Sequence, residues 1–136
     1  MIGSPGDWDT DIGGATTAAK PFSLSAWVKV DASESTHMRI FDFSNSDRRL
    51  SWDYTNNRIQ IVITGTAAGS KYSSTVDTDT WVHVVGTYAG GTAGALNIYI
   101  NGILDNAGGT TMNAPVAISG YDCYIGARRA VYDEWL

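Results

Sequence analysis

Runs of β-branched and aromatic residues, each about as long as a strand, alternate with turn-forming clusters from residue 22 onward. None of these runs shows the apolar period of an amphipathic helix. Several short strands at this spacing, without helices, are typical of an antiparallel β-sandwich or barrel. The sequence therefore predicts an all-β protein with strands at residues 22–30, 38–43, 49–54, 58–64, 81–88, 95–100, 103–105, 115–118 and 121–126.

The length and the strand pattern indicate a single domain over residues 1–136. A chain of this size can bury a hydrophobic core of its own, and no linker or internal repeat interrupts the pattern. Residues 1–20 are rich in Gly, Asp and Thr, and we expect them to form an irregular acidic lead-in to the first strand.

The chain is acidic, with 9 Lys and Arg against 14 Asp and Glu and a formal net charge of −5. This balance argues against nucleic acid or an anionic membrane as the partner, because both attract positive charge. No apolar run reaches the roughly 18 residues of a membrane span, and no signal peptide is expected in this sequence. Cys123 is the only cysteine, which excludes an intrachain disulfide and predicts a small buried apolar residue.

Two asparagine-containing turns indicate hairpins. Asn101-Gly102 lies between strand formers in "LNIYINGILDN", and this dipeptide is a strong hairpin signal because both turn positions need positive φ. Asn56-Asn57 predicts a second hairpin, because asparagine also tolerates positive φ.

A two-residue loop in the second hairpin would pair Tyr54 with Ile59, Trp52 with Ile61 and Leu50 with Ile63. These residues would then share one apolar face, while Ser51, Asp53, Gln60 and Val62 would share the other. We therefore expect Trp52 and Tyr54 in the core and not on a sugar-binding platform. The full predicted core is Trp27, Trp52, Ile59, Ile61, Val85, Ile98 and Ile100.

Four segments, "FSLSAWVKV", "TWVHVVGTYAG", "LNIYINGIL" and "YIGARR", follow one another within residues 22–129. In this order they resemble laminin-G-like domains of the concanavalin-A-like lectin/glucanase superfamily, and also pentraxins. The resemblance implies an antiparallel jelly-roll β-sandwich. It also implies an extracellular, cell-surface or virion recognition module that binds glycans or proteins, often with calcium.

The resemblance also implies a terminal strand at each end of the domain. This chain starts and stops roughly where those two strands should begin and end. Without them the sheet edges would be open, which favours pairing with another chain. We therefore expect a homodimer or higher oligomer, the alternative being a monomer whose residues 1–12 and 130–136 cover the gap.

His83, in "WVHVVGTY", could be a catalytic base, a metal ligand or a packed residue. The resemblance implies an interior position without a catalytic role, and no catalytic partner is evident in the sequence. His37 is expected in a loop, and the two histidines do not have the spacing of a zinc site. We expect His83 to be a hydrogen-bonded core residue.

A glucanase of this superfamily would carry a motif such as Glu-x-Asp-x-x-Glu on one strand, so that its carboxylates share a face. This chain has only two glutamates, Glu34 in a loop-like segment and Glu134 near the end. Neither lies in such a motif, so we do not expect catalysis.

Asp7, Asp9 and Asp11 alternate in "GDWDTDIGG". Carboxylates at this spacing in a loop can converge on calcium, although the segment is not an EF-hand. The sequence therefore predicts a candidate calcium site at these residues, the alternative being a solvated turn. Asp77 and Asp79 form a weaker candidate pair.

Sugar recognition combines aromatic faces with polar side chains. Asn97, Tyr99 and Asn101 alternate with apolar residues and are expected to face solvent. Arg58 and Gln60 would lie on the polar face of their own sheet, and Tyr72 lies in the polar segment "AAGSKYSST", expected to be a loop. These six residues are the candidate ligand-binding set.

Two functions therefore compete at the level of sequence. The first is a non-catalytic carbohydrate-binding module of a larger secreted, cell-surface or phage protein. The second is a protein-interaction or structural domain of an adhesin or fibre.

Overall fold

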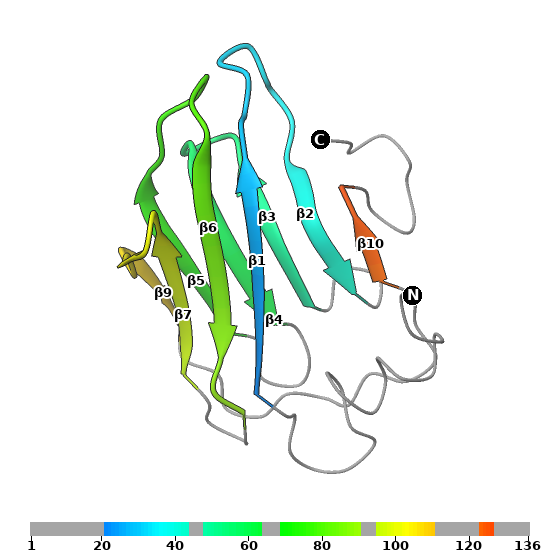
Figure 1. The fold of residues 1–136 in the computed structure, drawn as a ribbon, viewed down its shortest axis with the longest axis vertical. Coiled ribbons are helices and arrows are strands. Elements are labelled where there is room, and N and C mark those ends of the chain that lie inside the picture. The colour runs from blue at the N-terminus through cyan, green and yellow to red at the C-terminus, as the bar shows by residue number, and fades with distance from the viewer. Residues whose placement is uncertain (1–20, 44–47, 64–68, 91–94, 111–122, 127–136) are drawn as a thin grey trace.

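Two antiparallel β-sheets pack face to face in the computed structural model, as Figure 1 shows. The structure describes residues 21–43, 48–63, 69–90, 95–110 and 123–126. The strands are β1 (Phe22–Val28), β2 (Met38–Phe43), β3 (Arg48–Asp53), β4 (Arg58–Ile63), β5 (Gly69–Thr75), β6 (Val82–Tyr88), β7 (Leu96–Ile100), β8 (Ile103–Leu104), β9 (Gly108–Thr110) and β10 (Cys123–Ile125).

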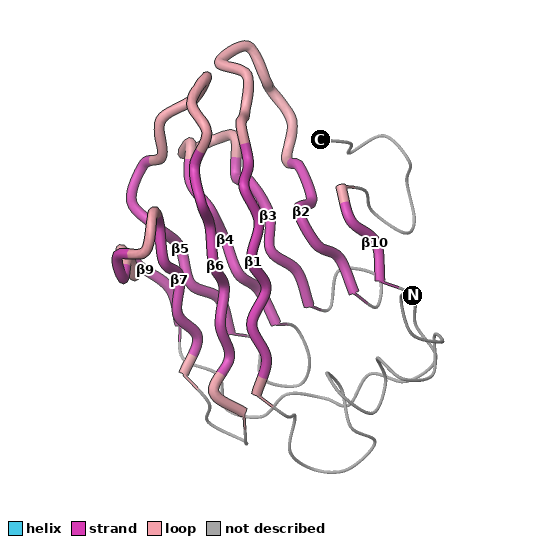
Figure 2. Tube along the Cα trace, viewed as in Figure 1, coloured by secondary structure: helices cyan, strands magenta, loops and turns pink. Residues whose placement is uncertain are grey.

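One sheet has four strands in the order β1-β6-β7-β8, and the other has six in the order β10-β2-β3-β4-β5-β9. The described part of the chain contains strands and loops but no helix (Figure 2), so the predicted all-β sandwich is confirmed. Within that part, no helix is long and apolar enough to span a membrane.

Most of the predicted strands are present within one or two residues of their expected bounds. The strand predicted at 115–118 lies outside the described residues. Two strands were missed, because β5 and β9 are made of Gly, Ser, Thr, Lys and Tyr with few strand formers. Their pairing is antiparallel, with Tyr72 opposite Gly108, so the sheet context overrides the weak local preference.

The core lies between the two sheets, because alternate side chains of each strand point inward. Trp52, Ile59, Ile61 and Ile98 are buried there as predicted. Ile100 is partly buried and packs against this core.

Two residues of the predicted core lie outside it. Trp27 is 64% exposed, because the buried residues Leu24 and Val28 of β1 place it on the opposite face. We call the face of each sheet that is turned away from the other sheet its outer face. Val85 of β6 lies half-buried on the outer face of the four-stranded sheet for the same reason, since Val84 on that strand points inward.

The hairpin at Asn101-Gly102 is confirmed. Ile100 pairs with Ile103 across it, and the two turn residues have φ of 51° and 82°. These values match the positive φ that this dipeptide adopts without strain.

The predicted register of the β3–β4 hairpin is wrong by two residues. Trp52 pairs with Ile59, and Asp53 pairs with Arg58, so the loop has four residues, 54–57. An even shift leaves each side chain on its own face of the sheet, which is why the buried residues of both strands were still predicted. Tyr54 alone moves from the expected core into the turn, where it is 39% exposed.

Gly86 of β6 lies where the two sheets come very close. A Cβ atom at this position would lie 2.9 Å from Ile61 Cδ1 and 3.1 Å from Leu50 Cδ1. Both of those side chains are fully buried, so neither can move aside into solvent. Glycine is therefore required here by space, not by backbone conformation.

We expect Gly86→Ala to lower the free energy of unfolding by about 1–3 kcal/mol, because it overpacks this contact. Ile61→Val removes the Cδ1 atom and alone should cost about 0.5–1.5 kcal/mol. The double variant should lose less stability than the sum of the two, as measured by urea denaturation in a double-mutant cycle. Additive losses would show that the Gly86–Ile61 contact does not limit the packing.

Candidate functional site

A pocket of about 280 Å³ opens on the outer face of the six-stranded sheet. Its lining is polar and comes from strands β2 to β5 and from the residue just before β2. We call it the polar pocket, and its lining residues are His37, Arg39, Arg49, Asp53, Arg58, Gln60 and Tyr72.

The strand register explains why these side chains gather. Asp53 pairs with Arg58, and Gln60 pairs with Tyr72, on neighbouring strands. Each of them alternates along its strand with a residue that points into the core, so all of them project from the opposite face. The side chains are thus placed by strands whose other face is anchored in the core.

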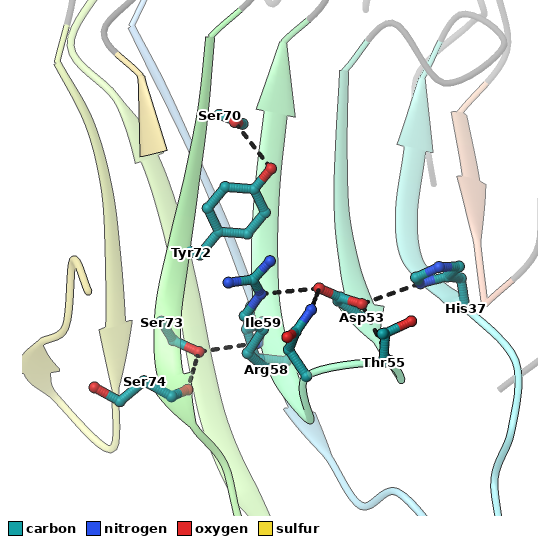
Figure 3. Close-up of polar contacts among 10 residues, drawn as sticks. His37, Asp53, Thr55, Arg58, Ile59, Ser70, Tyr72, Ser73 and Ser74 are labelled. Carbon is teal, nitrogen blue, oxygen red and sulfur yellow. Dashed lines mark hydrogen bonds and ion pairs between the residues drawn. The ribbon is translucent and has the colours of Figure 1, made fainter. Parts of the chain in front are cut away.

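Asp53 organises one side of the polar pocket, as Figure 3 shows. Its carboxylate accepts hydrogen bonds from Arg58 Nε at 2.8 Å, from Asn56 Nδ2 at 3.0 Å and from the Thr55 backbone N–H at 3.2 Å. His37 Nδ1 lies 3.6 Å from Asp53 Oδ1. The carboxylate therefore joins the 54–57 turn to the lining of the pocket.

The pKa of Asp53 lies below its usual range. Burial raises this pKa, but the hydrogen bonds from Asn56 and Arg58 and the positive charge of Arg58 together outweigh the effect of burial. The folded state thus favours a charged carboxylate at this position.

Arg58 is held on two sides. Its Nε bonds Asp53, and its Cζ atom lies 4.0 Å from the centre of the Tyr72 ring, which is a cation–π contact. The Tyr72 hydroxyl is itself bonded by Ser70 Oγ at 3.3 Å. The guanidinium is therefore held in one orientation by contacts within the chain.

Strand β5, which carries Tyr72, pairs with β4 and β9, and serine side chains add further hydrogen bonds. The Ile59 N–H donates to Ser73 Oγ at 2.9 Å, at the point where the β4–β5 register shifts. Ser74 donates to Asp105 Oδ1 from both its backbone N–H and its hydroxyl, each at 2.9 Å. These bonds compensate for the scarcity of apolar side chains in this strand.

The polar pocket is positively charged. Three arginines and one aspartate line it, a formal charge of +2 with His37 neutral. Asp42, which lies 3.8 Å from Arg39 Nε, offsets part of this charge. The sign is opposite to that of the whole chain, whose net charge is −5.

The six predicted ligand-binding residues fall into two groups. Arg58, Gln60 and Tyr72 meet in the polar pocket. Asn97, Tyr99 and Asn101 lie on or next to β7, alternating with buried Leu96 and Ile98, and so belong to the outer face of the four-stranded sheet. The two groups lie on opposite sides of the sandwich and cannot contact one small ligand together.

The second group belongs to what we call the aromatic face, formed by Trp27, His83, Val85 and Tyr99. The Trp27 and His83 rings lie 5.1 Å apart, and Tyr99 pairs with Val85 across the β6–β7 ladder. Asn101 Oδ1 accepts from the His83 backbone N–H at 3.0 Å.

Asn97 is likewise engaged within the chain. Its Oδ1 accepts a hydrogen bond from Asn106 Nδ2 at 2.9 Å. Both asparagines of the predicted set therefore have structural hydrogen bonds.

His83 is hydrogen-bonded, as predicted, but it does not lie in the core. It is half-buried on the outer face of β6, between the inward-pointing Val82 and Val84. Its Nε2 and the Ser25 hydroxyl are 2.9 Å apart. The prediction failed because the alternation within β6 sends the valines, not the histidine, toward the other sheet.

The aspartates of the predicted calcium site, Asp7, Asp9 and Asp11, lie outside the described residues. Among the residues that are described, no three His, Cys, Asp or Glu side chains come together as metal ligands could. Asp79 accepts a hydrogen bond from the Ala32 backbone N–H at 3.2 Å and so helps to join two loops.

Sequence reasoning missed four lining residues, which are His37, Arg39, Arg49 and Asp53. A signal for part of this set was present, because Asp53 and Gln60 were predicted to share the polar face of one hairpin. Extending the alternation back along β3 would have added Arg49. The position of Arg39 depends on the register shift between β2 and β3, which no sequence pattern indicates.

Two packed antiparallel sheets define a β-sandwich. The family is shown by the sequence as well: a laminin G family model, described as concanavalin A-like lectin/glucanases superfamily, matches residues 7–135. The chain belongs to this superfamily, as the resemblance implied. A comparison with curated proteins gives no match.

We expect Asp53→Asn to lower the free energy of unfolding by about 1–3 kcal/mol at pH 7, because it deprives Arg58 of its charged partner. A depressed folded-state pKa stabilises the protein above the usual aspartate pKa of about 4, and this contribution is lost as the pH falls through the folded-state pKa. The difference between wild type and variant should therefore stay constant from pH 7 to about pH 5 and shrink toward pH 3.

Urea denaturation at several pH values measures this difference. Asp77→Asn, which changes an exposed carboxylate, is the matched control and should change stability little at any pH. A difference for Asp53→Asn that persists unchanged at pH 3 would contradict the role given to its charge.

Proposed function

We propose that this domain is a non-catalytic recognition module that binds carbohydrate in the polar pocket. The observation that carries the proposal is the set of seven side chains that line this pocket, most of them on anchored strands. They combine an aromatic ring, an amide and planar guanidinium groups, which suit the apolar faces and hydroxyl groups of a sugar. Strands hold such groups more precisely than loops do.

The electrostatics of the polar pocket favour binding over hydrolysis. Most glycoside hydrolases use two carboxyl groups, one of which keeps its proton through a raised pKa. Asp53 is the one carboxylate among the described residues that line the pocket, and its pKa is shifted in the opposite direction. Both of its oxygens accept hydrogen bonds, Oδ1 from the Thr55 N–H and Oδ2 from Asn56 and Arg58, which favours the charged form.

The alternative function is a protein-interaction or structural domain of an adhesin or fibre. It is favoured by large apolar side chains exposed on or near the four-stranded sheet. Trp27 is 64% exposed, Trp81 66%, Ile103 73% and Leu104 56%. Exposed apolar surface of this kind is typical of protein-docking sites.

The wider setting that we propose is a larger secreted, cell-surface or phage protein, in which this domain forms homo-oligomers. The family membership supports a laminin-G-like module, and the setting follows from the way such modules are used. Calcium bound by Asp7, Asp9 and Asp11 is part of the same proposal.

A glycan array with matched tyrosine variants tests the proposed function. Wild-type protein should bind one class of glycan reproducibly, and Tyr72→Ala should weaken this binding about tenfold, the value of about 1.4 kcal/mol of lost ring contact. Tyr99→Ala makes the same chemical change on the opposite side of the sandwich and should leave binding unchanged. Thermal unfolding of each variant checks that the fold survives.

If the protein binds no glycan on the array, this result would contradict carbohydrate binding and favour the protein-interaction alternative. Binding that Tyr99→Ala removes and Tyr72→Ala retains would move the site to the aromatic face.

Calcium binding at the acidic lead-in should raise the melting temperature, because a ligand that binds only the folded state stabilises it. We expect wild-type protein to melt higher in millimolar calcium than in chelator, and the triple variant Asp7→Asn, Asp9→Asn, Asp11→Asn to melt equally in both. Identical melting of wild-type protein in the two buffers would exclude this site.

A further inference from the structure

The polar pocket concentrates positive charge in a chain that is otherwise acidic. Its described lining includes three arginines and a single carboxylate, whereas the whole chain has 9 Lys and Arg against 14 Asp and Glu. A site for a neutral sugar does not need a charge opposite in sign to the net charge of the chain. Positive charge collected in a concave site attracts and retains anions.

Arg58 presents its guanidinium in a state that is ready to bind. Within the described part of the chain it forms its hydrogen bond through Nε, to Asp53, while the Tyr72 ring contacts its Cζ atom. Figure 3 shows the guanidinium between the Tyr72 ring and Asp53, and its two terminal amino groups keep their donors. A planar fork of this kind matches the geometry of a carboxylate or sulfate group.

The one carboxylate in the lining does not prevent this. Asp53 accepts hydrogen bonds from Arg58, Asn56 and the Thr55 backbone, so its charge offsets that of Arg58 and leaves the described lining with a formal charge of +2. The other two lining arginines, Arg39 and Arg49, come from the two adjacent strands β2 and β3 and add their charge on the same face.

The face that carries the pocket also contains a buried hydroxyl that needs an acceptor. Ser51 lies between Arg39 and Gln60 in the cross-strand register, and its Oγ is buried with no hydrogen-bond partner among the described residues. A buried polar group without a partner is rare in native proteins. An anionic oxygen seated above this row would offer the missing acceptor.

We infer that the polar pocket binds an acidic saccharide, whose negatively charged oxygen group is held by the guanidinium groups of Arg39, Arg49 and Arg58. The inference rests on the proposed function, because it names the class of sugar for the same site. The charged group is a carboxylate or a sulfate ester of the sugar. Both can offer two oxygens side by side to the N–H groups of one guanidinium.

The first experiment uses isothermal titration calorimetry to measure how wild-type protein binds pairs of polymers that differ in charge. Polygalacturonate is compared with its carboxyl-reduced form, and dextran sulfate is compared with dextran. Binding to either charged polymer should be at least about tenfold tighter than to its neutral counterpart, the usual scale for a charge-assisted contact. The preferred pair identifies the group as carboxylate or sulfate.

The second experiment locates the charge that matters. Arg49→Gln should weaken binding of the acidic polymer by about tenfold or more, whereas Lys29→Gln, an exposed site just after β1 with the same loss of charge, should leave it unchanged. Arg58→Lys keeps the charge but loses the fork, and serves as the second variant if Arg49→Gln does not fold. Equal weakening by Lys29→Gln would overturn the inference in favour of non-specific attraction.

The outcomes separate the inference from the proposed function. Binding of neutral and charged polymers with equal affinity, lost in Tyr72→Ala, would overturn the inference and keep the proposed function. Absence of binding to every neutral and acidic glycan would overturn both.

Discussion

The hydrogen bonds of Asp53 determine how β3 and β4 meet and what lies on their outer face. The carboxylate binds the Thr55 N–H and Asn56 within the turn, and it binds Arg58 as the chain re-enters the sheet. These contacts favour a loop of four residues over one of two, and so set Trp52 opposite Ile59. Through that register Asp53 fixes the position of Arg58, and with it one wall of the polar pocket.

Alternation along strands made much of this fold predictable. The buried residues of the β3–β4 hairpin were identified although the register was two residues off, because an even shift preserves the face of every side chain. Tyr72 was assigned to a loop, since a strand of Gly, Ser, Lys and Thr exists only through its pairing with β4 and β9. Trp27 was placed in the core although its own strand alternates the other way. The pocket itself depends on how four strands align, which no single segment encodes.

The two outer faces of the sandwich have different chemistry. The six-stranded sheet carries guanidinium groups, a carboxylate and an amide around a hollow. The four-stranded sheet carries the Trp27–His83 ring pair beside Tyr99, and hydrogen bonds within the chain hold the asparagines next to them. One molecule thus carries a charged pocket on one side and an aromatic surface on the other, with the hydrophobic core between them.

The close approach of the sheets at Gly86 has a consequence for how such a domain can diversify. Leu50 and Ile61, which fill the space opposite Gly86, alternate along β3 and β4 with Arg49 and Gln60 of the polar pocket. Each of these strands therefore alternates residues that pack in the core with residues on the outer face. Exchanging Arg49, Gln60 or Tyr72 would change what the pocket accepts while the tightest contact of the interior keeps the same atoms. Chemical variation on the outer face and close packing in the interior are thereby assigned to different residues of the same strands.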